Sequence, residues 1–508
     1  MFTFLFALCF ISAANFAAGA QAPIIPQPMQ FDMGQTTLTL ASNFVFNSSS
    51  KSSTLVNAFE RYKSLIFSHT SSPTGTMLGS LSVTVDSADE NLGLDTDESY
   101  MLKIETSPAS AELHAANVYG ALHGLETFSQ LVMYNFTADA YQISNAPWNI
   151  NDKPRFPYRG LMIDTSRHFE PIRAVKQVLD AMAYAKLNVL HWHVVDSQSF
   201  PLQSVKYPKL WDGAYTGQER FTIDDAKDVV EYARQRGIWV LVEFDMPGHA
   251  ASWCVGYPEI CPAPDCTQPL NPATNATFDL IEGLLQEMTG VFPNQYIHLG
   301  GDEVNTNCWT KTPSVAAWMK SQNFTTDQAY MYFIERAHKI AHDVGRIPIN
   351  WEEVFNHFGT QLDKESIIHV WLNHATAAKI VAAGYRCILS NSDVWYLDHL
   401  TVTWEKFYDN DPFQGISDPN QQKLMLGGEV CMWGETVDPS DIDQTIWPRA
   451  AAAAERLWSP QDVTDHDQFL QRLLAFRCLL NRRGIKAAPA NNTQARSAPH
   501  GPGSCYKQ

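Results

Sequence analysis

The chain is poor in basic residues for its length. Its 508 residues include 36 Lys and Arg against 54 Asp and Glu, so the formal net charge is −18. A nucleic-acid partner is recognised largely by clustered Lys and Arg that neutralise phosphates, and nothing in the sequence concentrates them. We therefore expect no nucleic-acid partner.

Long hydrophobic runs are absent after residue 20, which excludes a helix that spans a bilayer in the mature chain. The first twenty residues do form an apolar run, and it ends in the small residues Ala18-Gly19-Ala20. We interpret residues 1–20 as a signal peptide, although the usual basic start is missing. The prediction is a protein of the secretory pathway that is lysosomal or secreted.

Cysteine is scarce, and none occurs between residues 10 and 253. Removal of Cys9 with the signal peptide leaves eight. Cys254 and Cys261 share a short proline-flanked loop in which a local disulfide closes easily. Cys387 and Cys431 lie in apolar, strand-like runs and are predicted to be buried free thiols. Spacing alone leaves the other pairings open.

Five sequons for N-glycosylation occur along the chain. Each is an Asn-X-Ser/Thr triplet, which is typical of proteins that pass through the secretory pathway. The five asparagines are Asn47, Asn135, Asn275, Asn323 and Asn491.

The length exceeds what one hydrophobic core supports, which favours two domains. Residues 21 to about 150 mix strand-like and helical patterns: Tyr100, Leu102 and Ile104 alternate as in a strand, and residues 115–132 have a helical pattern. A polar segment that ends at Pro154 marks the boundary. We expect a small α/β domain over 21–153 and a second domain over 154–508.

The second domain has eight apolar runs rich in β-forming residues, with helical patterns between most of them. This alternation predicts a (β/α)8 TIM barrel. A doubly wound sheet alternates similarly, but no glycine fingerprint follows its first strand. The runs are 159–164, 188–194, 238–244, 296–301, 347–351, 367–371, 385–390 and 426–434.

Carboxylates and aromatic residues recur at the ends of these runs, which in a barrel meet at one face. Aromatic rings stack on the C–H faces of sugars, and carboxylates and arginine bind sugar hydroxyls, so the mixture indicates a carbohydrate site. The candidate residues are Arg159, which unusually stands at the start of the first run, and Asp196, His249, Asp302, Glu303, Trp351, Trp371, Tyr396, Asp398, Trp433 and Glu435.

The segment HLGGDEVNTNCW, residues 298–309, is the most informative of these. Its two glycines allow close approach of the backbone to another group, and Asp302 and Glu303 follow at once. Side chains of neighbouring residues diverge, so this pair is badly placed as the acid and nucleophile that flank a scissile bond at about 5 Å. We therefore interpret Glu303 as the proton donor and Asp302 as the partner of a substrate N–H. That division fits a sugar whose own 2-acetamido oxygen attacks, a known exception to the two-carboxylate rule.

Several long motifs resemble those of the β-N-acetylhexosaminidases of glycoside hydrolase family 20, of the eukaryotic lysosomal and secreted type. They are RGLMIDTSRHF, HWHVVDSQSFP, EFDMPGHAASW, HLGGDEVNTNCW, CMWGE and WPRAAAAAERLW. The resemblance covers nearly the whole chain. It implies exo-acting, retaining hydrolysis of terminal GlcNAc or GalNAc from glycoconjugates or chitooligosaccharides through an oxazolinium intermediate. It implies no cofactor and no metal, and it leaves a homodimer open.

The same resemblance assigns roles in catalysis. Glu303 is implied as the general acid/base, Asp302 as the residue that orients the acetamide, and Tyr396 as a donor to the acetamide oxygen. Asp196 and His249 are implied to tune Glu303. A dry pocket is then expected to help Glu303 hold its proton.

It also assigns roles in binding and in covalent structure. Arg159 is implied to bind the 3- and 4-hydroxyls of the sugar, and Glu435 other hydroxyls. Three indoles are implied to wall the acetamide pocket: Trp351, Trp371 and Trp433. Two disulfides are implied, Cys266–Cys308 and Cys478–Cys505.

Two adjacent positions depart from relatives that accept sulfated sugars. In animals, the subunit type with that ability has Asn-Arg where this chain has Asp398-His399. A carboxylate near the 6-position repels a sulfate, so we predict a preference for neutral substrates. His399 offsets part of that repulsion at low pH.

Two other functions are weighed against this interpretation. A metal-dependent barrel hydrolase of the amidohydrolase kind also has a His-X-His motif after an early strand, with His191, His193 and His249 as candidate ligands. Bulky neighbours and the lack of a metal-bridging lysine disfavour it. A catalytically inactive sugar-binding relative would tolerate loss of the acid, but Asp302, Glu303 and Tyr396 are all present.

Overall fold

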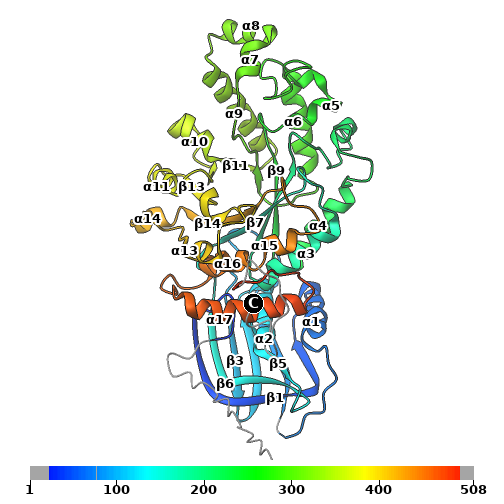
Figure 1. Ribbon diagram of the computed structural model, residues 1–508, viewed down its shortest axis with the longest axis vertical. Coiled ribbons are helices and arrows are strands. Elements are labelled where there is room, and N and C mark those ends of the chain that lie inside the picture. The colour runs from blue at the N-terminus through cyan, green and yellow to red at the C-terminus, as the bar shows by residue number, and fades with distance from the viewer. Residues whose placement is uncertain (1–21, 76, 492–508) are drawn as a thin grey trace, which may run out of the picture.

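The computed structural model describes residues 22–75 and 77–491, which form a six-stranded sheet and a closed, parallel, eight-stranded barrel. The sheet lies at one end of the long axis and the barrel at the other (Figure 1). The predicted TIM barrel with a preceding α/β domain is therefore confirmed. The predicted signal peptide and Cys505 lie outside the described residues.

The N-terminal sheet has the strand order β1-β2-β4-β3-β6-β5, and β1 also pairs with β6. Its strands are β1 (Gln30–Ser48), β2 (Met77–Val85), β3 (Tyr100–Thr106), β4 (Ala109–Ala115), β5 (Val132–Asn135) and β6 (Ala140–Asp152). In β3 the predicted alternation is confirmed, because Tyr100, Leu102 and Ile104 are buried and Met101 and Lys103 are exposed.

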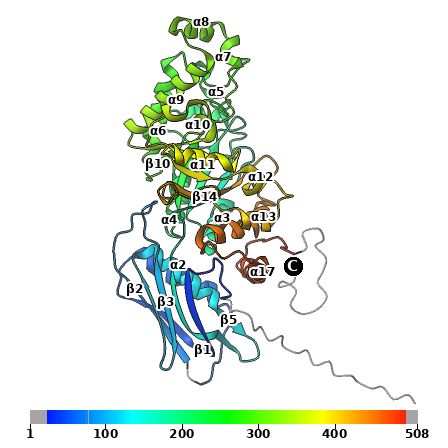
Figure 2. The ribbon, with the colours of Figure 1, turned by 90° about the vertical axis from the view of Figure 1, so that its left-hand side faces the viewer.

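Two helices belong to this sheet, α1 (Ser53–Ile66) and α2 (Val118–Leu131). The Asn117 side chain caps α2 by accepting from the backbone N–H groups of Tyr119 and Gly120. Every residue of α2 is buried, because this helix lies between the sheet and the barrel (Figure 2). Trp458 from the barrel domain packs into the same apolar core.

The barrel closes in the order β10-β11-β12-β13-β14-β7-β8-β9. Its strands are β7 (Tyr158–Asp164), β8 (Val189–Val195), β9 (Trp239–Phe244), β10 (Tyr296–His298), β11 (Ile347–Trp351), β12 (Ile367–Val370), β13 (Arg386–Leu389) and β14 (Met425–Met432). All eight predicted runs contain a strand. The fourth is shorter than predicted, since β10 ends at His298 and the residues after it turn.

Helices follow the strands and cover the outside of the barrel. They are α3 (Ile172–Tyr184), α4 (Ile223–Arg234), α5 (Trp253–Gly256), α6 (Asn275–Met288), α7 (Asn307–Lys311), α8 (Pro313–Gln322), α9 (Thr326–Asp343), α10 (Glu352–Phe358), α11 (His374–Ala382), α12 (Ser392–Trp395), α13 (Trp404–Asp409), α14 (Pro419–Gln422), α15 (Ile442–Ile446), α16 (Arg449–Trp458) and α17 (His466–Arg482), with 3-10 turns η1 (Pro208–Gly213), η2 (Pro258–Ile260) and η3 (Gly359–Gln361). The predicted start of α4 is confirmed by a capping box between Thr222 and Asp225. Among the helices of residues 22–75 and 77–491, none is long and apolar enough to cross a membrane.

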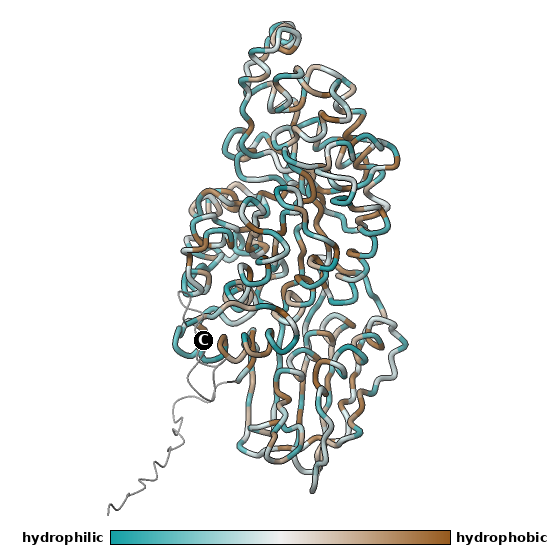
Figure 3. The backbone as a smooth tube through the Cα atoms, turned by 45° about the vertical axis from the view of Figure 1, so that its right-hand side comes forward, coloured by the Kyte–Doolittle hydropathy of each residue, from teal (hydrophilic) through white to brown (hydrophobic). Residues whose placement is uncertain are grey.

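Burial explains why the barrel strands are nearly continuous apolar runs. Every residue of β7, β8, β9 and β14 is buried, as expected for parallel strands covered on both faces. Figure 3 shows the hydrophobic stretches along these strands in the middle of the molecule. Charged and histidine side chains nevertheless occur inside the barrel, among them His191, Glu243 and Glu429, and they matter below.

The two domains share a buried polar interface. Lys186 Nζ lies 3.0 Å from Asp152 Oδ2, and both side chains are fully buried. Helix α17 runs along the junction, where Arg472 donates to the carbonyl of Ile24 at 3.1 Å. We propose residue 153 as the domain boundary, since β6 ends at Asp152 and β7 begins at Tyr158.

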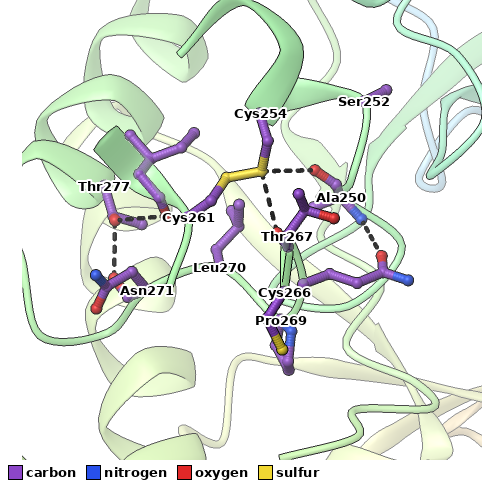
Figure 4. The surroundings of a disulfide bond; sticks show 12 residues. Ala250, Ser252, Cys254, Cys261, Cys266, Thr267, Pro269, Leu270, Asn271 and Thr277 are labelled. Atoms are coloured by element: carbon purple, nitrogen blue, oxygen red, sulfur yellow. Dashed lines mark hydrogen bonds between the residues drawn. A yellow bond between two sulfur atoms is a disulfide. The ribbon is translucent and has the colours of Figure 1, made fainter. Parts of the chain in front are cut away.

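Two disulfides fasten the loop that follows β9. Cys254 is bonded to Cys261 within that loop, as predicted (Figure 4). Cys266 is bonded to Cys308, which ties the same loop to α7. The pairing of Cys478 with Cys505 stays a prediction.

Two other sequence predictions concern exposure. Cys387 and Cys431 are buried free thiols, as predicted. All five sequon asparagines are exposed, although their glycosylation stays a prediction.

Glu170, between β7 and α3, is a buried carboxyl without a hydrogen-bond partner in the described part of the chain. Its exposure is 1%, and burial, aided by repulsion from Asp438 and Asp441, raises its pKa to about 8. The folded state therefore binds a proton that the unfolded chain releases near its ordinary value of 4.5. Below about pH 4.5 the carboxyl is protonated in both states, and the free energy of unfolding is unaffected. As the pH rises from about 4.5 towards 8, only the unfolded chain releases the proton, so the free energy of unfolding falls.

We expect Glu170→Gln to flatten this pH dependence. The gain in the free energy of unfolding over wild type should grow from pH 4.5 to pH 8, with an upper bound of about 4 kcal/mol. Denaturant unfolding at both pH values measures it, with the exposed Glu60→Gln as control. An equal difference at the two pH values would refute the assignment.

Candidate active site

A cavity of about 160 Å³ opens at the carboxyl ends of the barrel strands. Its lining comes from the loops after β7, β9, β10, β12, β13 and β14, as the barrel topology requires. The lining residues are Arg167, His249, Asp302, Glu303, Trp371, Tyr396, Asp398, His399, Trp433 and Glu435.

The turn after β10 brings two carboxylates to this cavity. Gly300 and Gly301 have φ of +61° and +96°, and a Cβ on Gly300 would lie 1.8 Å from Asp245 Oδ1. The backbone N–H of Gly301 instead donates to that oxygen at 3.0 Å. The predicted close approach of the backbone to another group is thus to Asp245, and it fixes Asp302 and Glu303 in place.

Two non-glycine residues at the cavity adopt left-handed backbone conformations. Glu303 has a φ of +48° and His249 a φ of +51°. Such conformations cost on the order of 1–3 kcal/mol and persist where the surroundings impose them, often at functional sites. The two strained residues contact each other, with His249 Nε2 3.3 Å from Glu303 Oε2.

His249 joins Asp196 to Glu303. Its Nδ1 lies 3.2 Å from Asp196 Oδ1 on the side opposite to Glu303. Burial disfavours the imidazolium, but the charge of Asp302 and the hydrogen bonds to Asp196 and Glu303 outweigh it and raise the pKa of His249 strongly. His249 is therefore a cation held between carboxylates.

The protonation of Glu303 differs from the expectation of a dry pocket. Its side chain is 60% exposed, and the hydrogen bond from His249 lowers its pKa below the ordinary value despite partial burial. The proton of this pair therefore resides on His249. The sequence named His249 as a residue that tunes Glu303, but the direction differs from the expectation, because the hydrogen bond from His249 stabilises the carboxylate of Glu303 more than partial burial destabilises it.

Asp302 lies deeper, with 10% of its side chain exposed. Burial raises its pKa, while His249 opposes the rise. Its neighbour Asp245 has a pKa raised far more, by burial and by the charge of Asp302. One proton is thus held on Asp245, and Asp302 keeps its charge. Asp302 Oδ1 has no partner among the described residues and can accept an N–H from a ligand.

Aromatic rings form the apolar wall. Trp371 and Tyr396 stack at 6.2 Å between ring centroids, and Tyr396 lies 6.0 Å from Trp433. Trp351 does not line the cavity in this structure: it is 1% exposed and lies beneath Trp433, with 6.0 Å between ring centroids. Trp351 therefore supports Trp433 from below and does not itself line the cavity.

Arg159 is the predicted site residue that the structure places elsewhere. It is fully buried at the start of β7, which is the opposite end of the barrel, and its guanidinium binds Glu98 of the N-terminal domain at 2.6 Å. A residue at the start of a parallel strand cannot reach the carboxyl ends. The prediction that Arg159 binds sugar hydroxyls is wrong.

Arg167 occupies the place that was given to Arg159, and sequence reasoning missed it. Its guanidinium lies over the Trp433 ring at 5.0 Å and contacts Asp164 and Asp196 at 2.8 Å each. The signal was present, because Arg167 follows the end of β7 in the same motif, TSRHF.

Asp398 and Glu435 frame the far side of the cavity. Glu435 Oε1 lies 3.6 Å from Arg167 Nη1. Asp398 Oδ1 has no partner within the described residues, and burial raises the pKa of this carboxyl. His399, adjacent to it, also lines the cavity. Three polar side chains thus line this side of the cavity, those of Asp398, His399 and Glu435.

Three groups of His and carboxylate residues could hold a metal ion within the described residues. They are His191–His369–Glu429, His191–Glu243–His298 and Asp245–His249–Asp302. Each depends on His191 or His249. Carboxylates raise the pKa of His191 to about 9 against the effect of burial, and that of His249 is raised as well. Metal ligation needs a neutral imidazole, whereas among the described residues carboxylates bind both of these histidines and favour their charged form.

The three histidines weighed as ligands for the amidohydrolase alternative do not come together in the cavity. His193 and His249 bind opposite oxygens of Asp196, and His191 and His193 are buried inside the barrel. The amidohydrolase alternative is therefore not favoured.

Comparison with known proteins agrees with this geometry. Residues 156–461 match "Glycosyl hydrolase family 20, catalytic domain", and residues 24–131 match "beta-acetyl hexosaminidase like". The chain is 49% identical to beta-hexosaminidase 1 of Arabidopsis thaliana, over 95% of this chain and 94% of that protein. It is 38% identical to beta-hexosaminidase subunit beta of Homo sapiens, over 91% of this chain and 88% of that protein. A chitobiase structure from Flavobacterium johnsoniae superposes with a TM-score of 0.82 at 30% identity, over 93% of this chain and 76% of that chain.

Proposed function

The chain belongs to glycoside hydrolase family 20 and is an exo-acting β-N-acetylhexosaminidase, and from this premise we propose that it cleaves terminal GlcNAc or GalNAc by substrate-assisted, retaining hydrolysis. The observation that carries the proposal is the pair of carboxylates at one cavity with different environments. Asp302 is buried with a free oxygen, and Glu303 is exposed and bound to His249.

In the first step the substrate supplies the nucleophile. Asp302 accepts the acetamide N–H, and the Tyr396 hydroxyl donates to the acetamide oxygen. Burial raises the pKa of Tyr396, so its proton stays available. The acetamide oxygen attacks the anomeric carbon as the glycosidic C–O bond breaks, and Glu303 protonates the departing oxygen. The product of this step is an oxazolinium ion beside the charge of Asp302.

In the second step Glu303, now a carboxylate, removes a proton from water. The water oxygen attacks the anomeric carbon from the side that the leaving group vacated, the oxazoline ring opens, and the sugar leaves with retained configuration. Binding of substrate covers Glu303 and excludes water. Its pKa then rises, and the proton on His249 passes to Glu303 before the first step.

The other cavity residues hold the sugar. We assign to Arg167 the binding of ring hydroxyls that was expected of Arg159, together with Glu435 and Asp398. Trp433 and Trp371 contact the sugar ring and the acetamide methyl, with Trp351 as the floor. The exposed sequons and the two disulfides support entry into the secretory pathway, and so a lysosomal or secreted enzyme.

Initial rates on four aryl glycosides test the proposed function. We expect hydrolysis of β-GlcNAc and β-GalNAc, none of β-glucoside, and slower hydrolysis of 6-sulfated β-GlcNAc because Asp398 repels the sulfate.

Replacement of Asp398 with asparagine tests this specificity. Asp398→Asn should raise the sulfated-to-neutral ratio of kcat/KM roughly tenfold. Since the pKa of Asp398 is raised, discrimination should weaken as the pH falls and this carboxyl gains a proton. Equal wild-type rates on sulfated and neutral substrate would refute the specificity, and hydrolysis of the glucoside would refute the function.

A further inference from the structure

Glu243 is a fully buried carboxylate inside the barrel that the proposed mechanism does not use. Its Oε2 lies 2.5 Å from His193 Nδ1 and 3.0 Å from His191 Nε2. Its Oε1 accepts the indole N–H of Trp351 at 2.9 Å and lies 3.0 Å from His298 Nδ1. A buried carboxylate with four such contacts organises the side chains around it.

From Glu243 an unbroken row of contacts leads to the acid/base. His193 binds Glu243 through Nδ1 and Asp196 through Nε2, the latter at 2.8 Å. Asp196 binds His249, which binds Glu303. We call these five residues, Glu243–His193–Asp196–His249–Glu303, the barrel chain.

The row also extends away from the cavity. His191, which contacts Glu243, binds Glu429 Oε1 through Nδ1 at 2.8 Å. Tyr158, at the start of β7, donates to Glu429 Oε2 at 2.6 Å. These groups are fully buried, so solvent does not screen the charges that hold the inner end of the barrel chain.

Charges alternate along the barrel chain. Burial disfavours an imidazolium at His193, but Glu243 and Asp196 outweigh it and raise the pKa of His193 well above the ordinary value. Burial likewise opposes the charge of Glu243, but the surrounding histidines lower its pKa. The row is therefore anion, cation, anion, cation and anion. Removal of one buried member leaves its neighbour's charge uncompensated.

We propose that Glu243 and His193 are positioning residues for Glu303, which set how firmly Asp196 holds the proton on His249. The inference rests on the proposed role of Glu303 as acid. Cationic His193 binds one oxygen of Asp196 and so weakens the negative charge that the other oxygen presents to His249. His249 then gives its proton to Glu303 more readily when substrate binds.

Other charged groups face this chain and stay in place when Glu243 is changed. Arg167 contacts Asp196 at 2.8 Å, so it supplies a second cation there. Three members of the barrel chain face Arg167: Asp196, Glu303 and His249, whose Nδ1 lies 3.4 Å from Arg167 Nη2. The other groups are Asp164 for His193, Asp245 and Asp302 for His249, and His191 and His298 for Glu243. Because Arg167 remains, we expect loss of the Glu243 charge to weaken the acid and not to abolish it.

Glu243→Gln tests the proposal, because glutamine keeps the shape and an acceptor for Trp351 but removes the charge. His193 then loses its proton, Asp196 holds His249 more firmly, and Glu303 stays ionised. We expect kcat/KM on an N-acetylglucosamine disaccharide to fall at least about tenfold. The 2,4-dinitrophenyl glycoside, whose leaving group needs no proton, should change less than about threefold. The basic limb of the pH profile on the disaccharide should move to higher pH by about one unit, because His249, held more firmly by Asp196, releases the proton of the pair later.

His123→Gln is the matched control. His123 is also a buried histidine bound to a glutamate, at 2.8 Å from Glu98, but it lies at the domain interface outside the barrel chain. It should leave the ratio of the two substrates and the pH profile unchanged. His193→Gln serves as the second variant if Glu243→Gln does not fold, and the same changes are expected of it.

If Glu243→Gln lowered kcat/KM equally on both substrates and left the basic limb of the pH profile unchanged, the role of Glu243 would be merely structural. That result would overturn the proposal. Glu303→Gln, assayed in parallel, separates this failure from failure of the proposed function. If Glu303→Gln keeps full activity on the disaccharide, the acid assignment itself is wrong. If Glu303→Gln collapses while folded Glu243→Gln behaves as wild type, only the barrel chain is refuted.

Discussion

Replacement of Glu303 with glutamine is expected to lower kcat on a GlcNAc disaccharide by about 10²–10⁴-fold. Glutamine preserves the volume of the side chain and a hydrogen bond to His249, which lies 3.3 Å from Glu303 in the structure. It cannot donate a proton to the departing oxygen or remove one from water. The loss corresponds to about 2.7–5.4 kcal/mol of transition-state stabilisation.

Steady-state kinetics and binding of the product sugar measure this effect together. Affinity for GlcNAc should stay within a few-fold of wild type, which separates loss of chemistry from loss of the site. Glu335→Gln, an exposed glutamate on α9, is the control and should behave as wild type. Unchanged turnover in folded Glu303→Gln would contradict the role of Glu303 and favour another acid.

Asp302→Asn is expected to lower kcat by about 10²–10³-fold, through a different step. Asp302 keeps its charge because Asp245 beside it holds the proton, its side chain lines the cavity, and its Oδ1 has no hydrogen-bond partner among the described residues. Asparagine cannot supply the negative charge beside the oxazolinium ion, and its amide can turn an N–H towards the acetamide N–H. Both the alignment of the nucleophile and the stabilisation of the intermediate are lost.

The dependence on leaving group distinguishes the two carboxylates. Asp302→Asn should slow the disaccharide and the 2,4-dinitrophenyl glycoside by similar factors in their first step, because both need the acetamide to attack. Glu303→Gln should spare the activated substrate in that step. Single-turnover rates on both substrates measure the difference. If Asp302→Asn spared the activated substrate as Glu303→Gln does, Asp302 would have to be part of the acid and not the partner of the acetamide.

Much of the fold could be predicted because local patterns and tertiary packing agree. The eight apolar runs are buried on both faces in the barrel, so they are recognisable from composition alone. The error at β10 has a local cause. Gly300 and Gly301 adopt positive φ to avoid Asp245, so an apolar run that continues through Leu299 is not a strand to its end.

The site could be predicted where a residue follows a strand and not where it precedes one. Asp302, Glu303, Tyr396 and Trp433 follow their strands and line the cavity, whereas Arg159 stands at the start of β7 and lies at the other end of the barrel. Because the site lies at the carboxyl ends of the strands, the direction of β7 was sufficient to favour Arg167, which follows the strand, over Arg159.

Protonation and the barrel chain could not be predicted from sequence. The state of Glu303 depends on His249, which comes from a different strand end. The partners of Glu243 come from β8, β10 and β11, and only closure of the barrel brings them together. In the sequence Glu243 and the histidines that contact it are single polar residues within apolar runs, and nothing in those runs indicates that they contact one another.

The central claim is that the substrate's own acetamide oxygen attacks the anomeric carbon. Fluorination of the acetyl methyl group weakens that oxygen as a nucleophile while it changes the size of the group little. The most direct measurement is kcat/KM of the wild-type enzyme on aryl N-acetylglucosaminides with zero, one, two and three fluorines. A steep fall with each fluorine is predicted, and rates that are independent of fluorination would contradict the mechanism.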